Sequence, residues 1–153
     1  MTTPLLPAAL VFLQGLDEST ALDPAQAQAI DAASEAFAID PELLAMQPDA
    51  QVLDVRRAAV FAQAGTQIPG AHWCNPVHIG SAEASGLPAP GAARQLVVYC
   101  VHGHAVSQSA VLALRALGHD ARFLQGGIAA WVATGRPVVA SEPPGAGKPG
   151  APS

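Results

Sequence analysis

The stretch LVVYCVHGHAVSQSAVLALRALG, residues 96–118, decides the fold of this chain. An apolar, β-prone run ends on Cys100. A short loop follows, and a helical pattern begins near Val106 or Ser107 and stops at Gly118. A run that is apolar at every position is typical of a strand covered on both faces. Cys100 is therefore predicted to stand at the carboxyl end of a buried strand.

Strand and helix patterns alternate on both sides of this stretch. The segments AQVLDVR (50–56) and DARFL (120–124) predict two further buried strands, and helices are predicted at 57–65 and 126–135. This alternation predicts an α/β fold, an open parallel sheet with helices on both faces. Ligand sites in such sheets form outside the carboxyl ends of the strands, which is where Cys100 is expected.

Composition excludes several classes of protein. A chain of 153 residues with 50% hydrophobic and 12% charged residues suits one globular domain. The net charge of -5 and the lack of a basic cluster argue against nucleic acid as a partner. Two cysteines are too few for a disulfide framework, so we expect reduced thiols. The amino-terminal segment resembles neither a signal peptide nor a membrane span, which predicts a cytoplasmic protein without a membrane partner.

The two ends of the chain differ from its middle. A helical pattern at 22–37 predicts an N-terminal helical extension, residues 1–39. The main domain is expected at 40–140, beginning with a short helix capped by Asp40. Residues 141–153 are rich in Pro and Gly and are expected to form a disordered tail.

The loop after Cys100 has the properties of an anion site. Backbone N–H groups between a strand end and a helix start can face a common centre, and the helix dipole adds positive potential there. Such a setting favours a thiolate, the nucleophilic form of cysteine. Gly103 permits a tight turn, while His102 and His104 can donate hydrogen bonds to an anion. The candidate substrate-binding loop is Val101, His102, Gly103, His104, Ala105, Val106 and Ser107.

Three blocks of the sequence resemble a single-domain rhodanese, a family of sulfurtransferases. VLDVR (52–56) is similar to the family's first buried strand, and IPGAHW (68–73) is similar to its I-P-G-A turn. VVYCVHGHAVS (97–107) resembles the cysteine loop. LQGGIAAWVATGRPV (124–138) matches the closing pattern L-x-G-G-x-x-x-W-x-x-x-G-x-P, which is the most specific of these blocks.

The resemblance implies a rhodanese-like fold and a chemistry without cofactors. Cys100 matches the cysteine that accepts a sulfane sulfur as a persulfide, and Val101 to Val106 match the loop whose amides hold it. Asp54 and Arg56 match a charged pair that supports the site. A small donor such as thiosulfate would be used first, and cyanide, glutathione or a protein thiol would then take the sulfur.

The cysteine loop departs from the common pattern C-x-x-G-x-R-S. Ala105 and Val106 stand where an arginine and a serine are usual, and the serine comes one residue later, at Ser107. Histidines are then the titratable groups of the loop, which predicts modest affinity for a dianion. The form C-x-x-G-x-x-x-S-Q resembles a rhodanese variant of chromate-resistance proteins, so chromate or arsenate stress is a further context.

Cys74 has two interpretations. It is a buried strand residue that replaces an aliphatic side chain, or it is a resolving thiol that attacks the persulfide. Histidines lie near both cysteines, but no C-x-x-C or H-x-x-x-H spacing occurs. No metal site is therefore expected.

Two other functions stay open beside the enzyme. A persulfide carrier or adaptor would hand its sulfur to one docked protein, and the missing loop arginine favours this alternative. A cysteine phosphatase or arsenate reductase of related fold is disfavoured, because the phosphate clamp C-x-x-x-x-x-R is absent.

Overall fold

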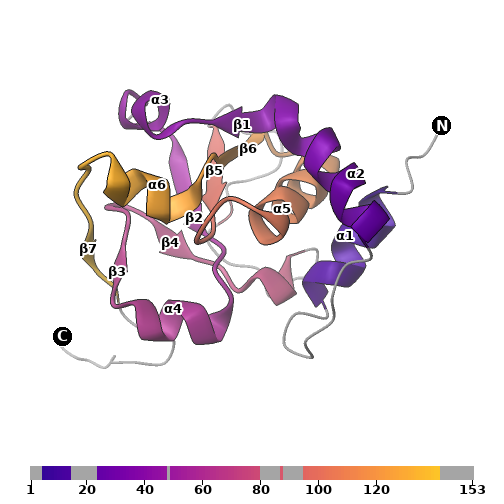
Figure 1. The fold of residues 1–153 in the computed structure, drawn as a ribbon, viewed down its shortest axis with the longest axis horizontal. Coiled ribbons are helices and arrows are strands. Elements are labelled where there is room, and N and C mark those ends of the chain that lie inside the picture. Colours follow the sequence, from indigo (N-terminus) through magenta and orange to yellow (C-terminus); the bar gives the residue numbers. More distant parts are fainter. Residues whose placement is uncertain (1–4, 15–23, 48, 80–86, 88–94, 142–153) are drawn as a thin grey trace.

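A five-stranded parallel sheet forms the centre of the computed structural model (Figure 1). The structure describes residues 5–14, 24–47, 49–79, 87 and 95–141. The strand order is β1-β6-β5-β2-β4. These strands are β1 (Ala38–Ile39), β2 (Gln51–Asp54), β4 (His72–Trp73), β5 (Leu96–Tyr99) and β6 (Ala121–Leu124). Two short strands, β3 (Thr66–Gln67) and β7 (Val139–Ala140), form a separate antiparallel pair.

Helices cover both faces of the sheet, as predicted. Figure 1 shows α1 and α2 beside α5, while α3 and α6 lie on the other side of the strands. The helices are α1 (Leu5–Gln14), α2 (Pro24–Ser34), α3 (Pro41–Ala45), α4 (Ala58–Ala64), α5 (Ala105–Ala116) and α6 (Gly127–Ala133). The predicted α/β class and the alternation of strands and helices are therefore confirmed.

Each face of the sheet has its own apolar core. Alternate residues of the parallel strands point to opposite faces, so a strand covered on both sides is apolar throughout. All four residues of β5 are buried. The core under α1 and α5 includes Phe12, Leu13, Leu53, Val98, Val111, Leu114 and Phe123. The core under α3 and α6 includes Ile39, Leu44, Val97, Tyr99, Leu124 and Trp131.

The N-terminal segment is integrated with the rest of the fold. Both α1 and α2 pack against α5, and the side-chain amide of Gln108 in α5 donates a 2.6 Å hydrogen bond to Asp31 in α2. Ala38 and Ile39 add the edge strand β1, which the sequence did not reveal. The helix predicted at 22–37 is observed as α2 followed by one 3-10 turn.

Local caps explain where the short helices begin and end. Asp40 caps α3 as predicted, because its carboxylate accepts a 2.7 Å hydrogen bond from the amide of Leu43. Gly65 ends α4 in the left-handed conformation, at φ 79°. Of the expected disordered tail, residues 142–153 lie outside the described part of the chain.

The strand register places three loops at one edge of the sheet. Asp54 at the end of β2 lies opposite Tyr99 of β5 and Trp73 of β4. The residues that follow these strands, including Cys100, therefore leave the sheet at the same carboxyl edge.

Candidate active site

Cys100 follows β5 directly and is 7% exposed. Its thiol donates a hydrogen bond to the Ser107 hydroxyl, with 3.2 Å between Sγ and Oγ, and that hydroxyl donates to the His104 carbonyl at 3.4 Å. Ser107 is fully buried in the first turns of α5. When the thiol is deprotonated, the hydroxyl can reverse its role and donate to the thiolate. The displaced serine of the loop thus lies beside the sulfur.

Helix α5 begins at Ala105, slightly before the predicted start near Val106 or Ser107. His104 precedes it without a side-chain capping bond. The boundary was difficult to predict because no Ser, Thr, Asn or Asp stands at the capping position, which His104 occupies.

The N-terminus of α6 holds the loop at its base. The amide of Ile128 donates to the carbonyl of Cys100 at 3.0 Å, and the amide of Ala129 donates to the carbonyl of Val101 at 3.0 Å. These amides belong to the first turn of α6, where N–H groups lack partners within their own helix. The cysteine loop therefore caps α6.

Close backbone approach explains the glycines on both sides of this contact. Gly103 has φ 75°, and a Cβ atom there would lie 2.7 Å from the amide nitrogen of Gly126. Gly127 has φ 63°, and its Cβ atom would overlap the carbonyl of Val101. The G-G pair of the closing pattern is thus required by the approach of α6 to the cysteine loop.

Cys100 opens into a cavity of about 270 Å³. His102 and His104 are exposed at this cavity, and their ring centroids are 6.1 Å apart. Aliphatic side chains make up much of the remaining wall. The lining residues are Arg56, Arg57, Val60, Cys100, Val101, His102, His104, Ala105 and Val106.

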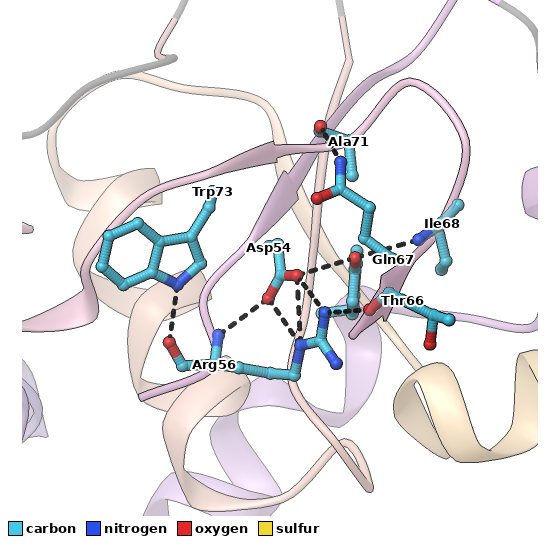
Figure 2. A network of polar contacts seen from close by, with 8 residues as sticks. Asp54, Arg56, Thr66, Gln67, Ile68, Ala71 and Trp73 are labelled. Carbon is cyan, nitrogen blue, oxygen red and sulfur yellow. Dashed lines mark hydrogen bonds and ion pairs between the residues drawn. The ribbon is translucent and has the colours of Figure 1, made fainter. Parts of the chain in front are cut away.

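A buried polar network holds Arg56, one of the residues that line the cavity (Figure 2). The carboxylate of Asp54 accepts hydrogen bonds from Arg56, with 2.6 Å between Oδ2 and Nη2. The hydroxyl of Tyr99 donates to the same carboxylate at 2.9 Å and accepts from the amide of Ile68 at 3.2 Å. Arg56 Nη2 also donates to the carbonyl of Thr66 at 2.8 Å. Asp54 and Arg56, for which the resemblance implies a supporting role, form a buried ion pair, and Tyr99 joins it.

The network shifts two pKa values upward. Burial raises the pKa of Tyr99 well above its usual value, and the neighbouring charge of Asp54 raises it further. Burial by itself would lower the pKa of Arg56, but the hydrogen bonds and charge of Asp54 outweigh it and leave a net rise. Tyr99 is therefore a neutral hydrogen-bond donor, and Arg56 is a permanent cation.

Cys74 lies away from the cavity that Cys100 lines. Its side chain is fully buried in the apolar core under α1 and α5, and its amide donates to the carbonyl of Asp54 at 2.8 Å. This position favours the structural interpretation of Cys74. In the described ranges, no group of three His, Cys, Asp or Glu side chains could hold a metal ion.

Two residues at the site were not predicted from the sequence. Arg57 is adjacent to the supporting pair, yet nothing in its sequence context connects it with Cys100. Tyr99 is read most simply as one more apolar position of a buried strand. The sequence does hold a signal for Tyr99, because the hydroxyl of a tyrosine in a buried strand requires a hydrogen-bond partner.

The comparisons with known proteins agree with this geometry. The family model "Rhodanese-like domain" matches residues 41–134. A comparison with curated protein sequences finds no match.

Along the helices of the described residues, no segment has the length and apolarity needed to cross a bilayer.

Several solved structures are similar to the chain. A thiosulfate sulfurtransferase from Pseudomonas aeruginosa is 34% identical over 67% of this chain, with a TM-score of 0.55, and 19% of that protein is covered. The Alr3790 protein from Anabaena sp. is 29% identical, with 66% of this chain and 80% of that protein covered and a TM-score of 0.54. A rhodanese-like domain protein from Staphylococcus aureus is 26% identical, with 61% of this chain and 89% of that protein covered and a TM-score of 0.51. The chain thus spans less than a fifth of the Pseudomonas protein, but the match of the family model covers most of this chain, which therefore belongs to the rhodanese-like family.

Proposed function

We propose that the protein is a sulfurtransferase that carries a sulfane sulfur as a persulfide on Cys100. One observation supports this most directly: the Cys100 sulfur lies at the cavity, beside the Ser107 hydroxyl, at the start of a loop that leads into α5. Membership of the rhodanese-like family and the similarity to a thiosulfate sulfurtransferase point to the same chemistry.

The reaction has two steps, and Cys100 is the nucleophile in the first. Its thiolate attacks the outer sulfur of thiosulfate, a new S–S bond forms, and sulfite leaves with the electrons of the old S–S bond. In the second step cyanide or a thiolate attacks the outer sulfur of the persulfide, and the Cys100 thiolate is released. No net oxidation or reduction of the protein occurs.

The surrounding residues stabilise charge and do not transfer electrons. The amides of the loop Val101 to Val106 and the hydroxyl of Ser107 are assigned to hold the thiolate and then the persulfide anion. Asp54 and Tyr99 keep Arg56 in place. His102 and His104, exposed at the cavity, are assigned to the incoming donor.

A persulfide carrier is the second candidate function. The cavity is open, and Val60, which lines it, is 37% exposed although its side chain is apolar. A protein thiol approaching Cys100 would cover Val60, whereas a small acceptor would leave it exposed to water. In this case the sulfur is loaded on Cys100 but turnover requires a protein partner.

Thiosulfate-to-cyanide turnover with intact-mass measurement tests the proposal. We expect wild type and Cys74→Ser to gain one sulfur and to turn over. Cys100→Ser should lose turnover at least about a thousandfold, because it lacks the nucleophile. A loaded Cys100 without turnover would favour the carrier. Substantial activity in Cys100→Ser would refute the mechanism.

A further inference from the structure

Two arginines from outside the cysteine loop line the cavity of Cys100. Arg56 and Arg57 follow β2 after Val55, and both are lining residues of that cavity. From Cys100 to Gln108 the chain contains neither Lys nor Arg. The permanent positive charge at the lining of this cavity therefore comes from the segment after β2.

The two arginines contribute differently. Arg56 is 3% exposed, and its Nε and Nη2 atoms are occupied by Asp54 and Thr66. No hydrogen bond of Arg56 Nη1 is seen within the described part of the chain (Figure 2). Since the Asp54 carboxylate offsets its charge, Arg56 offers a fixed N–H donor more than a net charge. Arg57 is an exposed guanidinium at the lining of the same cavity.

We propose that Arg57, assisted by the Nη1 donors of Arg56, binds the sulfonate end of an anionic sulfur donor and makes the protein prefer dianionic donors. This inference rests on the proposed function and names the part of the site that selects the donor. Arginine suits the task because its planar donors match the oxygens of sulfonates and phosphates. The charge that the loop lacks is thus provided by the other wall of the cavity.

The bound sulfonate would direct the outer sulfur of the donor at Cys100. The Cys100 thiolate and thiosulfate give a Cys100 persulfide anion and sulfite. The bond between Sγ and the outer sulfur forms, and the bond between the outer sulfur and the sulfonate sulfur breaks. The total charge is unchanged and no proton is required. Methanethiosulfonate reacts in the same way and releases methanesulfinate, but it carries one negative charge less.

The test compares these two donors in Arg57→Gln. Loss of an exposed charged contact should raise KM for thiosulfate about tenfold and KM for methanethiosulfonate about threefold, with kcat nearly unchanged. Arg57→Lys should recover most of the thiosulfate preference. Arg136→Gln is the matched control, because Arg136 lines a different cavity, beside Trp131. It should change KM for both donors less than about twofold.

Equal changes for both donors, or equal effects of Arg57→Gln and Arg136→Gln, would overturn the inference. Calorimetric titration of Cys100→Ser with thiosulfate separates this outcome from failure of the proposed function. If wild type transfers no sulfur but Cys100→Ser binds thiosulfate and loses that binding with Arg57→Gln, only the proposed function fails. If transfer is normal and binding ignores Arg57, only the inference fails.

Discussion

The two sides of the Cys100 cavity are stabilised in different ways. The cysteine loop is fixed through its backbone, by the amides of Ile128 and Ala129 and by glycines that permit close approach. The segment after β2 is fixed through side chains, by the network that joins Asp54, Arg56 and Tyr99. A backbone site tolerates changes in most loop side chains, whereas a side-chain network fails when one member is removed. The backbone of the loop therefore positions the reactive sulfur, and the side-chain network positions Arg56 at the lining of the same cavity.

The largest effect on stability is expected for Asp54→Asn. Removing this carboxylate leaves the buried Arg56 guanidinium without its counter-charge. Loss of one partner of a buried ion pair lowers the free energy of unfolding by about 3–5 kcal/mol. Urea unfolding should show a loss of that size in the free energy of unfolding. Donor use should weaken too, because Arg56 would no longer be held at the cavity.

Asp120→Asn is the matched control for this substitution. Asp120 pairs with Arg115 at 3.5 Å on the surface, where its side chain is 49% exposed. The expected loss is below about 1 kcal/mol. Similar losses in the two variants would contradict the importance of burial in the network.

Gly103→Ala tests the backbone side of the comparison. Residue 103 has φ 75°, which is unfavourable for alanine, and the new methyl group would also clash with the amide of Gly126. We therefore expect the free energy of unfolding to fall by about 3 kcal/mol. Gly135→Ala is the control, since Gly135 has φ 81° but open space around the site of its Cβ. It should lose only about 1 kcal/mol, the cost of the conformation.

Activity adds a second measurement to this pair of glycine variants. Gly103→Ala should also slow persulfide formation, because the loop must move away from α6, while Gly135→Ala should not. A Gly103→Ala protein as stable and active as the control would show that the loop is not pressed against α6.

The cysteine loop could be predicted from the sequence better than the segment after β2. Cys100, Gly103 and Ser107 lie within one short segment whose strand-loop-helix pattern states their arrangement directly. Arg57 is distant from Cys100 in sequence, and only the pairing of β2 with β5 brings their carboxyl ends together. Their place at one cavity depends on strand order, which local periodicity does not encode.

The N-terminal segment also makes contacts that local sequence patterns do not predict. The boundary at residue 39 stays a prediction, and the structure adds that Ala38 and Ile39 form an edge strand of the central sheet. A strand of two residues has too few positions to show a period of two. The packing of α1 on α5 was hidden as well, because Pro7 interrupts the helical pattern.

The smallest effect, and the sharpest test of the network, is expected for Tyr99 at high pH. Burial and Asp54 raise the pKa of its phenol above the usual 10.0, so the folded protein keeps its proton where the unfolded chain loses it. The stabilisation from this shift is fully present below pH 10 and is lost as pH rises further, by about 1.4 kcal/mol for each pH unit. Tyr99→Phe lacks this dependence but loses the hydroxyl contacts, which costs about 1–2 kcal/mol at neutral pH.

The difference in unfolding free energy between wild type and Tyr99→Phe should therefore shrink as pH rises above 10. Because Tyr99 is the single tyrosine of the chain, phenolate absorbance reports on it alone. We expect that absorbance to appear only when the protein unfolds. A phenolate that titrates near pH 10 in the folded protein would place Tyr99 in contact with water. Arg56 would then be held by Asp54 without a third buried partner, and the contrast between a backbone-held loop and a side-chain network would weaken.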